Sequence, residues 1–179
     1  MLITIEYTAL NSFDYRQQGL QSQPAIISAD AAFSFRNQFA DQWYDLLNPD
    51  LSGTPMTVRF TTRREDFPPN LDDLRIQQVL LYFSRVDRGT FELDISALRF
   101  TEQGSSAAVG GGAATIDGTV STRRGNAGSW SPMLGKGVVG SWELALADTE
   151  QLRGYFKNDS IQDVLFVITY SGNRSEWNL

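Results

Sequence analysis

RIQQVLLYFSR at residues 75–85 and IQDVLFVITYS at residues 161–171 decide the fold class. Each stretch contains a short, nearly continuous apolar run, Ile76–Phe83 in the first and Ile161–Ile168 in the second. Apolar runs of this length are typical of strands that are covered on both faces near the core of two packed sheets. We therefore expect these runs to be inner strands of two stacked sheets.

Alternation of apolar and polar residues extends the series of strands. In Met56–Thr61, the side chains of Met56, Val58 and Phe60 fall on one face, as in a half-buried strand. Further strands with this pattern are expected at residues 2–5, 91–101, 115–123 and 141–147. The sequence therefore predicts an all-β protein, an antiparallel β-sandwich.

Two short helices are expected as connectors between strands. Phe35–Leu47 spaces its apolar residues at intervals of three and four and stops before Asn48-Pro49. Gln151–Phe156 follows two candidate N-cap residues, Asp148 and Thr149. We predict one or two short helices beside the sheets.

The stretch Gly104–Ala114 (GSSAAVGGGAA) contains only small residues and has too little apolar volume to anchor itself. We predict a flexible loop here, and a turn at Asp87-Arg88-Gly89. The small-residue stretch also fits a linker between two domains. Because its flanks have strand character, we favour a loop inside one domain that spans residues 1–179.

The composition excludes several classes of protein. The chain has no cysteine and no histidine, so disulfides, thiolate nucleophiles and the commonest general base and metal ligand are missing. A net charge of −6 argues against a nucleic-acid partner. No apolar run reaches the ~20 residues of a transmembrane helix, and Met1–Ala9 does not resemble a signal peptide. We expect a non-enzymatic protein without cofactor or metal.

Carboxylate pairs are the main alternative to this non-enzymatic interpretation. Asp72 with Asp73, and Asp45 with Asp50, are the nearest groupings that resemble the acid and base of a hydrolase. Each pair lies beside turn residues or a strand start, where aspartate normally caps or turns the backbone. The sequence therefore favours a structural role for them.

Two arginine clusters are the better candidates for a binding surface. One precedes Glu65-Asp66, where it also fits a self-neutralised turn, and the other opens a glycine-rich segment that ends in a tryptophan. Arginine and tryptophan are enriched among the residues that dominate interfaces. The predicted partner- or ligand-binding residues are Arg63, Arg64, Arg123, Arg124, Asn126 and Trp130. An exposed Trp130 would also suit a glycan-binding, lectin-like module, which remains an alternative.

The C-terminal third carries an ordered set of motifs. It consists of Gly137–Leu146 (GVVGSWELAL), then Tyr155-Phe156, then Ile161–Tyr170 (IQDVLFVITY). This set resembles the C-terminal end of the large A subunit of bacterial Tc (ABC-type) insecticidal toxin complexes. Residues 7–16, 41–46 and 56–69 look similar to a branch of A-subunit-related proteins, so the resemblance covers most of the chain.

The resemblance implies a function. The corresponding region of the family is a β-sandwich that binds the B subunit, at the end of a pentameric injection channel, and carries no catalysis. It implies a toxin B subunit or B–C complex as partner, a pentameric homo-oligomer, and a secreted or host-targeted location. With 179 residues the chain lacks the family's pore-forming, receptor-binding and shell regions, so it is either an excised fragment or a free-standing relative.

Overall fold

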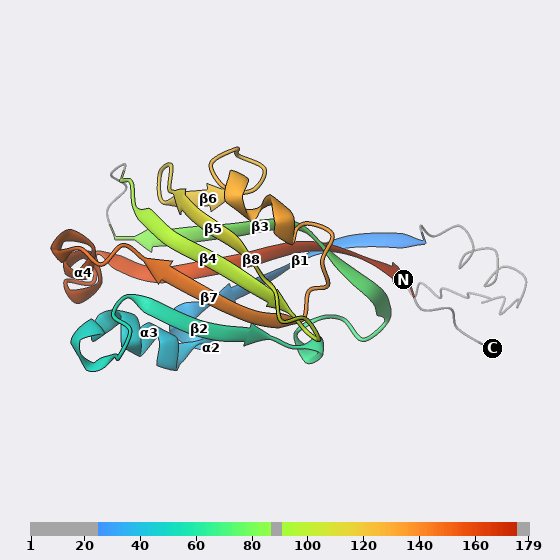
Figure 1. Cartoon of the computed structure of the whole chain (residues 1–179), viewed down its shortest axis with the longest axis horizontal. Coiled ribbons are helices and arrows are strands. Elements are labelled where there is room, and N and C mark those ends of the chain that lie inside the picture. The colour runs from blue at the N-terminus through green and yellow to red at the C-terminus, as the bar shows by residue number, and fades with distance from the viewer. Residues whose placement is uncertain (1–24, 87–90, 175–179) are drawn as a thin grey trace, which may run out of the picture.

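The computed structural model describes residues 25–86 and 91–174, which form two four-stranded antiparallel sheets packed face to face (Figure 1). The first sheet has the order β1 (Ile26–Ser34), β8 (Ile161–Arg174), β3 (Leu71–Arg85) and β6 (Thr119–Ser121). The second has the order β2 (Thr57–Thr62), β7 (Gly140–Leu146), β4 (Asp94–Glu102) and β5 (Ala108–Ala114). The prediction of an antiparallel β-sandwich is confirmed.

The two apolar runs are inner strands, but they lie in one sheet. Ile76–Phe83 belongs to β3 and Ile161–Ile168 to β8, and the two strands pair directly, with Val79 opposite Ile168. The expectation that both runs are inner strands is confirmed, because each has a neighbouring strand on either side. From Val79 to Phe83 and from Val164 to Ile168 every second side chain is buried against the other sheet, while the side chains between them are exposed or only partly covered on the outer face.

Alternation predicted three of the remaining strands, β2, β4 and β7, and part of β6. Met56, Val58 and Phe60 are buried on one face at and beside β2, as expected. The strands expected at 91–101 and 141–147 are β4 and β7, whereas 115–123 contains only the three-residue β6. The strand expected at 2–5 and the turn at 87–89 lie outside the described residues.

Short helices connect the strands at their ends. Residues 35–47 form two helices, α2 (Phe35–Gln38) and α3 (Ala40–Leu47), because the backbone at Phe39 leaves the helical region (φ −118°, ψ 53°). The second predicted helix is α4 (Glu150–Lys157), and its N-cap is Thr149, whose hydroxyl accepts a hydrogen bond from Leu152 N at 3.2 Å. Three 3-10 helices complete the described elements: η1 (Pro49–Leu51), η2 (Arg64–Asp66) and η3 (Gly128–Met133).

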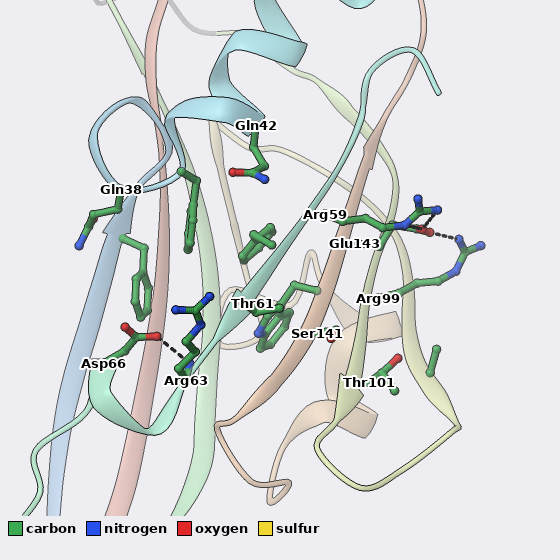
Figure 2. Close-up of a pocket in the computed structure, with 15 residues that line it drawn as sticks. Gln38, Gln42, Arg59, Thr61, Arg63, Asp66, Arg99, Thr101, Ser141 and Glu143 are labelled. Carbon is green, nitrogen blue, oxygen red and sulfur yellow. Dashed lines mark hydrogen bonds and ion pairs between the residues drawn. The ribbon is translucent and has the colours of Figure 1, made fainter. Parts of the chain in front are cut away.

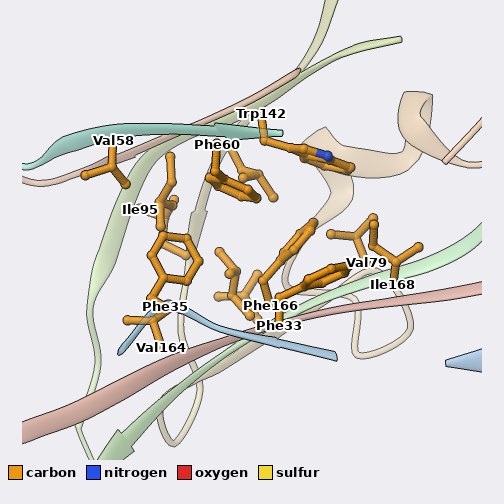
Figure 3. Close-up of a cluster of buried hydrophobic side chains, with 14 of the residues drawn as sticks. Phe33, Phe35, Val58, Phe60, Val79, Ile95, Trp142, Val164, Phe166 and Ile168 are labelled. Carbon is orange, nitrogen blue, oxygen red and sulfur yellow. The ribbon is translucent and has the colours of Figure 1, made fainter. Parts of the chain in front are cut away.

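Aromatic side chains from both sheets meet in the core (Figure 3). Phe166 of β8 lies at the centre, with its ring centroid 5.2 Å from that of Phe60 on β2 and 4.7 Å from that of Trp142 on β7. Phe33 of β1 approaches the same ring at 6.0 Å. The first two contacts join the sheets, because β8 belongs to the first sheet and β2 and β7 to the second.

The prediction of a flexible loop at residues 104–114 is wrong over most of its length. Only residues up to 107 form a connection, and Ala108–Ala114 is the edge strand β5, which pairs with β4. Its glycines allow close packing, because a Cβ at Gly110 would lie 2.0 Å from Leu98 O. The helix η3 covers the strand, and its Trp130 donates a hydrogen bond from Nε1 to Gly111 O at 2.9 Å. The small residues are therefore a packing requirement.

A glycine-to-alanine comparison tests this explanation. Gly110→Ala introduces both the clash and a side chain at φ +124°, so it should lower the free energy of unfolding by about 1–3 kcal/mol or more. Gly53→Ala, at a site with open space around the added Cβ, should change it by less than about 0.5 kcal/mol. Urea denaturation at 25 °C measures both values, and equal values for the two variants would contradict the role given to β5.

Candidate functional site

A groove of about 780 Å³ follows β2, which is the edge strand of the second sheet (Figure 2). One wall is the outer face of that sheet, and the other comes from the end of β1, from α2 and α3, and from residues just after β2. We call it the edge groove. Its lining residues that carry the argument below are Phe39, Gln42, Arg59, Thr61, Arg63 and Glu143.

Strand register builds a charged row across the outer face beside the edge groove. Arg59 of β2, Glu143 of β7 and Arg99 of β4 are opposite one another. Arg59 Nη2 and Arg99 Nη1 each lie 2.7 Å from a carboxylate oxygen of Glu143. The hydrogen bonds from Arg59 and Arg99 hold the pKa of Glu143 below its ordinary value of 4.5. The row is therefore a fixed ion-pair network with two arginines and one carboxylate.

The edge groove combines an aromatic floor with a positive rim. The rings of Phe33, Phe60 and Trp142 are buried beneath it, and Phe39 is half-buried. Three arginines and two carboxylates line the groove, although the whole chain carries a net charge of −6. The groove is thus locally more positive than the rest of the protein.

A second, smaller hollow of about 420 Å³ lies on the outer face of the first sheet. Leu80 and Val167 are opposite each other on β3 and β8, and the same face carries the partly exposed Tyr82 and Leu165. Arg123, in the turn that follows β6, lines this hollow together with Gln78 and Thr169. The outer face of the first sheet therefore has an apolar centre with a polar surround.

The structure separates the two arginines of the first predicted cluster. Arg63 lines the edge groove, and its side chain is 69% exposed, with Glu65 3.5 Å away. Arg64 instead donates hydrogen bonds to the backbone carbonyls of Phe67 and Pro68, at 3.2 and 2.9 Å, and to that of Leu71. Arg64 therefore holds the loop between η2 and β3, and Arg63 belongs to the candidate surface.

The second predicted cluster is also divided. Arg123 and Arg124 are exposed, but Asn126 bonds to three backbone groups, those of Ala114, Thr119 and Ser121, at 2.9–3.1 Å. Trp130, expected on an exposed loop, is fully buried in η3. That expectation is wrong, because the indole ring fills the space between β5 and the rest of the core. The ring is not available to stack on a sugar.

Sequence reasoning did not identify Gln42, Arg59, Arg99 or Glu143 as site residues. Each looks like an ordinary solvent-facing residue of a helix or strand, and they meet only through strand pairing and the position of α3. The one local signal was the alternation in β2 and β7, which places Arg59 and Glu143 on outer faces.

Two of the four aspartates considered for hydrolysis, one from each pair, have structural partners. Asp73 lies in a left-handed backbone conformation (φ 48°) and forms an ion pair with Arg75 at 2.6 Å. Asp50 pairs with Arg153, whose pKa is raised by the hydrogen bonds that it donates to the carboxylates of Asp148 and Asp50. Within residues 25–86 and 91–174, no group of three or more acidic side chains is placed to hold a metal ion. None of the helices in this part of the chain is long and apolar enough to span a membrane.

Comparison with known proteins gives matches in structure alone. No protein-family model matches the chain, and no curated protein matches it. The fold is similar to part of Yersinia pseudotuberculosis TcaA-TcaB, with 16% sequence identity and a TM-score of 0.51, over 89% of this chain and 10% of that chain. Morganella morganii TcdA4 matches at 15% identity and a TM-score of 0.45, over 89% of this chain and 8% of that one. This chain thus spans about a tenth of the length of the structures it resembles.

Alanine variants of the two adjacent arginines test whether Arg64 stabilises the loop and Arg63 does not. Arg64→Ala removes hydrogen bonds to several loop carbonyls, so the free energy of unfolding should fall by about 1–3 kcal/mol. Arg63→Ala, with its exposed side chain, should change it by less than about 0.5 kcal/mol. Chemical denaturation of both variants distinguishes them, and a larger loss for Arg63→Ala would show that the roles are reversed.

The ion-pair network predicts a pH dependence. Because the pKa of Glu143 is lower in the folded chain than its ordinary value of 4.5, its stabilisation is present above pH 4.5 and is lost as the pH falls through the folded-state pKa. Glu143→Gln should therefore be less stable than the unmodified chain at pH 7, by up to about 1 kcal/mol. The difference should shrink below pH 4.5. Denaturation curves at several pH values measure it, and a constant difference would refute this assignment.

Proposed function

We propose that this chain is a non-catalytic docking domain of a Tc-type toxin assembly that binds the complex of the B and C subunits. The observation that carries the proposal is the fold similarity to the TcaA-TcaB structure, which extends over 89% of this chain. The ordered motifs of the C-terminal third support it, since they form β7, part of α4 and β8 in this fold. Docking requires neither of the residue types, cysteine and histidine, that the sequence lacks.

The surface of the sandwich is compatible with a docking role. Stable protein–protein interfaces bury roughly 800 Å² on each partner and have an apolar centre with a polar rim. The outer face of the first sheet has this composition, with Leu80, Tyr82 and Val167 at its centre, and the edge groove adds a second recessed surface. A glycan-binding role has less support, because the aromatic residue it relied on, Trp130, is buried.

The proposal concerns one part of a larger assembly. The chain covers only 10% of the matching TcaA-TcaB chain. The proposal therefore assigns docking to this domain, and pore formation and receptor binding to other regions of such assemblies. It includes a pentameric arrangement and a secreted or host-targeted location, as the family resemblance implies.

Binding to an immobilised B–C subunit complex tests the proposal directly. The folded chain should bind saturably, with a dissociation constant in the micromolar range or below, in biolayer interferometry. Phe166→Asp places a charge in the fully buried core and should abolish folding, so this variant controls for non-specific adsorption. Absence of saturable binding by the folded chain at high micromolar concentration would rule out the proposal.

A further inference from the structure

We propose that the free edge of β2 binds an extended segment of a protein partner as an added strand, and that this segment alternates apolar and acidic side chains. The inference rests on the proposed docking role, which it deepens by naming the contact surface and the chemistry of the partner segment. It does not require that the partner be the toxin B subunit.

Unpaired backbone groups are the first observation. Met56 O accepts a hydrogen bond from Leu146 N at 2.9 Å. In an antiparallel pair, every second residue of a strand forms backbone hydrogen bonds with the neighbouring strand, and the residues between them point their N–H and C=O groups away from it. Val58 and Phe60 therefore bond to β7, whereas the N–H and C=O groups of Arg59 and Thr61 point away from it. No described residue outside β7 forms a backbone hydrogen bond with Arg59 or Thr61. Such an edge is a template for another strand.

The ends of the free edge are closed. At one end Thr57 N donates to Thr54 O at 3.1 Å. At the other end η2 turns back, so that Arg63 N donates to Asp66 Oδ2 at 2.6 Å and Arg63 O accepts from Asp66 N at 3.1 Å. The open part runs from the carbonyl of Thr57 to that of Thr61, which suits a segment of about five residues at ~3.4 Å each.

The inner side of this edge is apolar and has room for side chains. The ring of Phe60 packs against that of Phe39 at 4.8 Å between centroids, and Phe39 remains half-buried at the wall of the edge groove. Figure 2 shows Gln38 and Gln42 on the helix side of the same space. Alternate side chains of an added strand point into this groove, and apolar ones bury the exposed part of the aromatic floor.

The outer side is positive. The side chains of Arg59 and Arg63 are 70% and 69% exposed, and Arg59 shares Glu143 with Arg99. The remaining side chains of an added strand lie beside these arginines, where carboxylates are favoured. A second copy of this chain is disfavoured as the occupant, because two β2 edges would place arginines beside arginines and each copy carries a net charge of −6.

A synthetic peptide of roughly seven residues that alternates valine and glutamate tests the proposal. It should bind to the full chain in isothermal titration calorimetry, and the same peptide with lysine in place of glutamate should bind roughly tenfold more weakly or not at all. Equal binding of the two peptides, or binding of neither, would overturn the inference.

Proline variants on two sheet edges supply the matched control. Thr61→Pro removes an outward N–H from β2 and leaves its bonds to β7 intact, so peptide affinity should fall by roughly tenfold or more. Ser28→Pro makes the same change on β1. The hydrogen bond from Arg174 N to Ala25 O sets the alternation along β1, so that the N–H of Ser28 points away from β8. This variant should leave peptide affinity unchanged. Arg63→Glu, which changes only an exposed side chain, should also weaken binding. Unchanged affinity in both Thr61→Pro and Arg63→Glu would contradict the assignment.

Amide hydrogen exchange locates the contact. The amides of Arg59 and Thr61 should exchange fast in the free chain and become protected with the peptide, while those of Val58 and Phe60 should be protected in both states. Protection of Arg59 and Thr61 in the free chain would mean that the edge is already occupied, and the inference would be wrong.

Binding of the B–C complex to Thr61→Pro separates this inference from the proposed function. Equal binding of the complex to the variant and to the unmodified chain would leave the docking role intact and remove β2 as the contact. Peptide binding without any binding of the B–C complex would retain the inference and reject the proposed function.

Discussion

The contact between aromatic rings of the two sheets is the interaction on which the rest of the structure depends. Phe166 reaches from the first sheet to Phe60 and Trp142 of the second, and all three rings are buried (Figure 3). The chain contains no cysteine, so no disulfide can join the sheets. Burial of large aromatic side chains and their edge-to-face geometry therefore provide the stabilisation. The positions of both sheet edges follow from this packing.

The two lateral edges of the sandwich are covered to different extents. On the side of β5 and β6, η3 packs over the edge and Asn126 bonds to the carbonyls of Ala114 and Thr119, which joins the two sheets. On the side of β1 and β2, the helices α2 and α3 cover only part of the edge, and Phe35 and Phe39 pack on Phe60. The uncovered part of this side is the edge groove. An open edge beside a rigid core is suited to recognition, because partner binding does not require the core to rearrange.

Sequence patterns predicted those strands whose apolar residues alternate strongly, such as β2 and β7, because burial of one face imposes that period. They missed β1 and β5, since alanine, serine and glycine give weak alternation, and these edge strands are specified by the neighbours they pair with. The candidate site was predictable only in part. Arg63 and Arg123 were predicted as binding residues and are exposed in the structure, but the burial of Trp130 depends on the packing of η3 against β5, which no local pattern encodes.

A double-mutant cycle on Phe60 and Phe166 tests the central claim, that aromatic contacts join the two sheets. Each phenylalanine is replaced by leucine, alone and together, and the free energy of unfolding is measured for all four proteins by chemical denaturation. The ring contact at 5.2 Å predicts a favourable coupling energy of about 0.5–1.5 kcal/mol between the two positions. A coupling energy of zero would mean that the two rings do not interact, and the packing of the sheets described above would be incorrect.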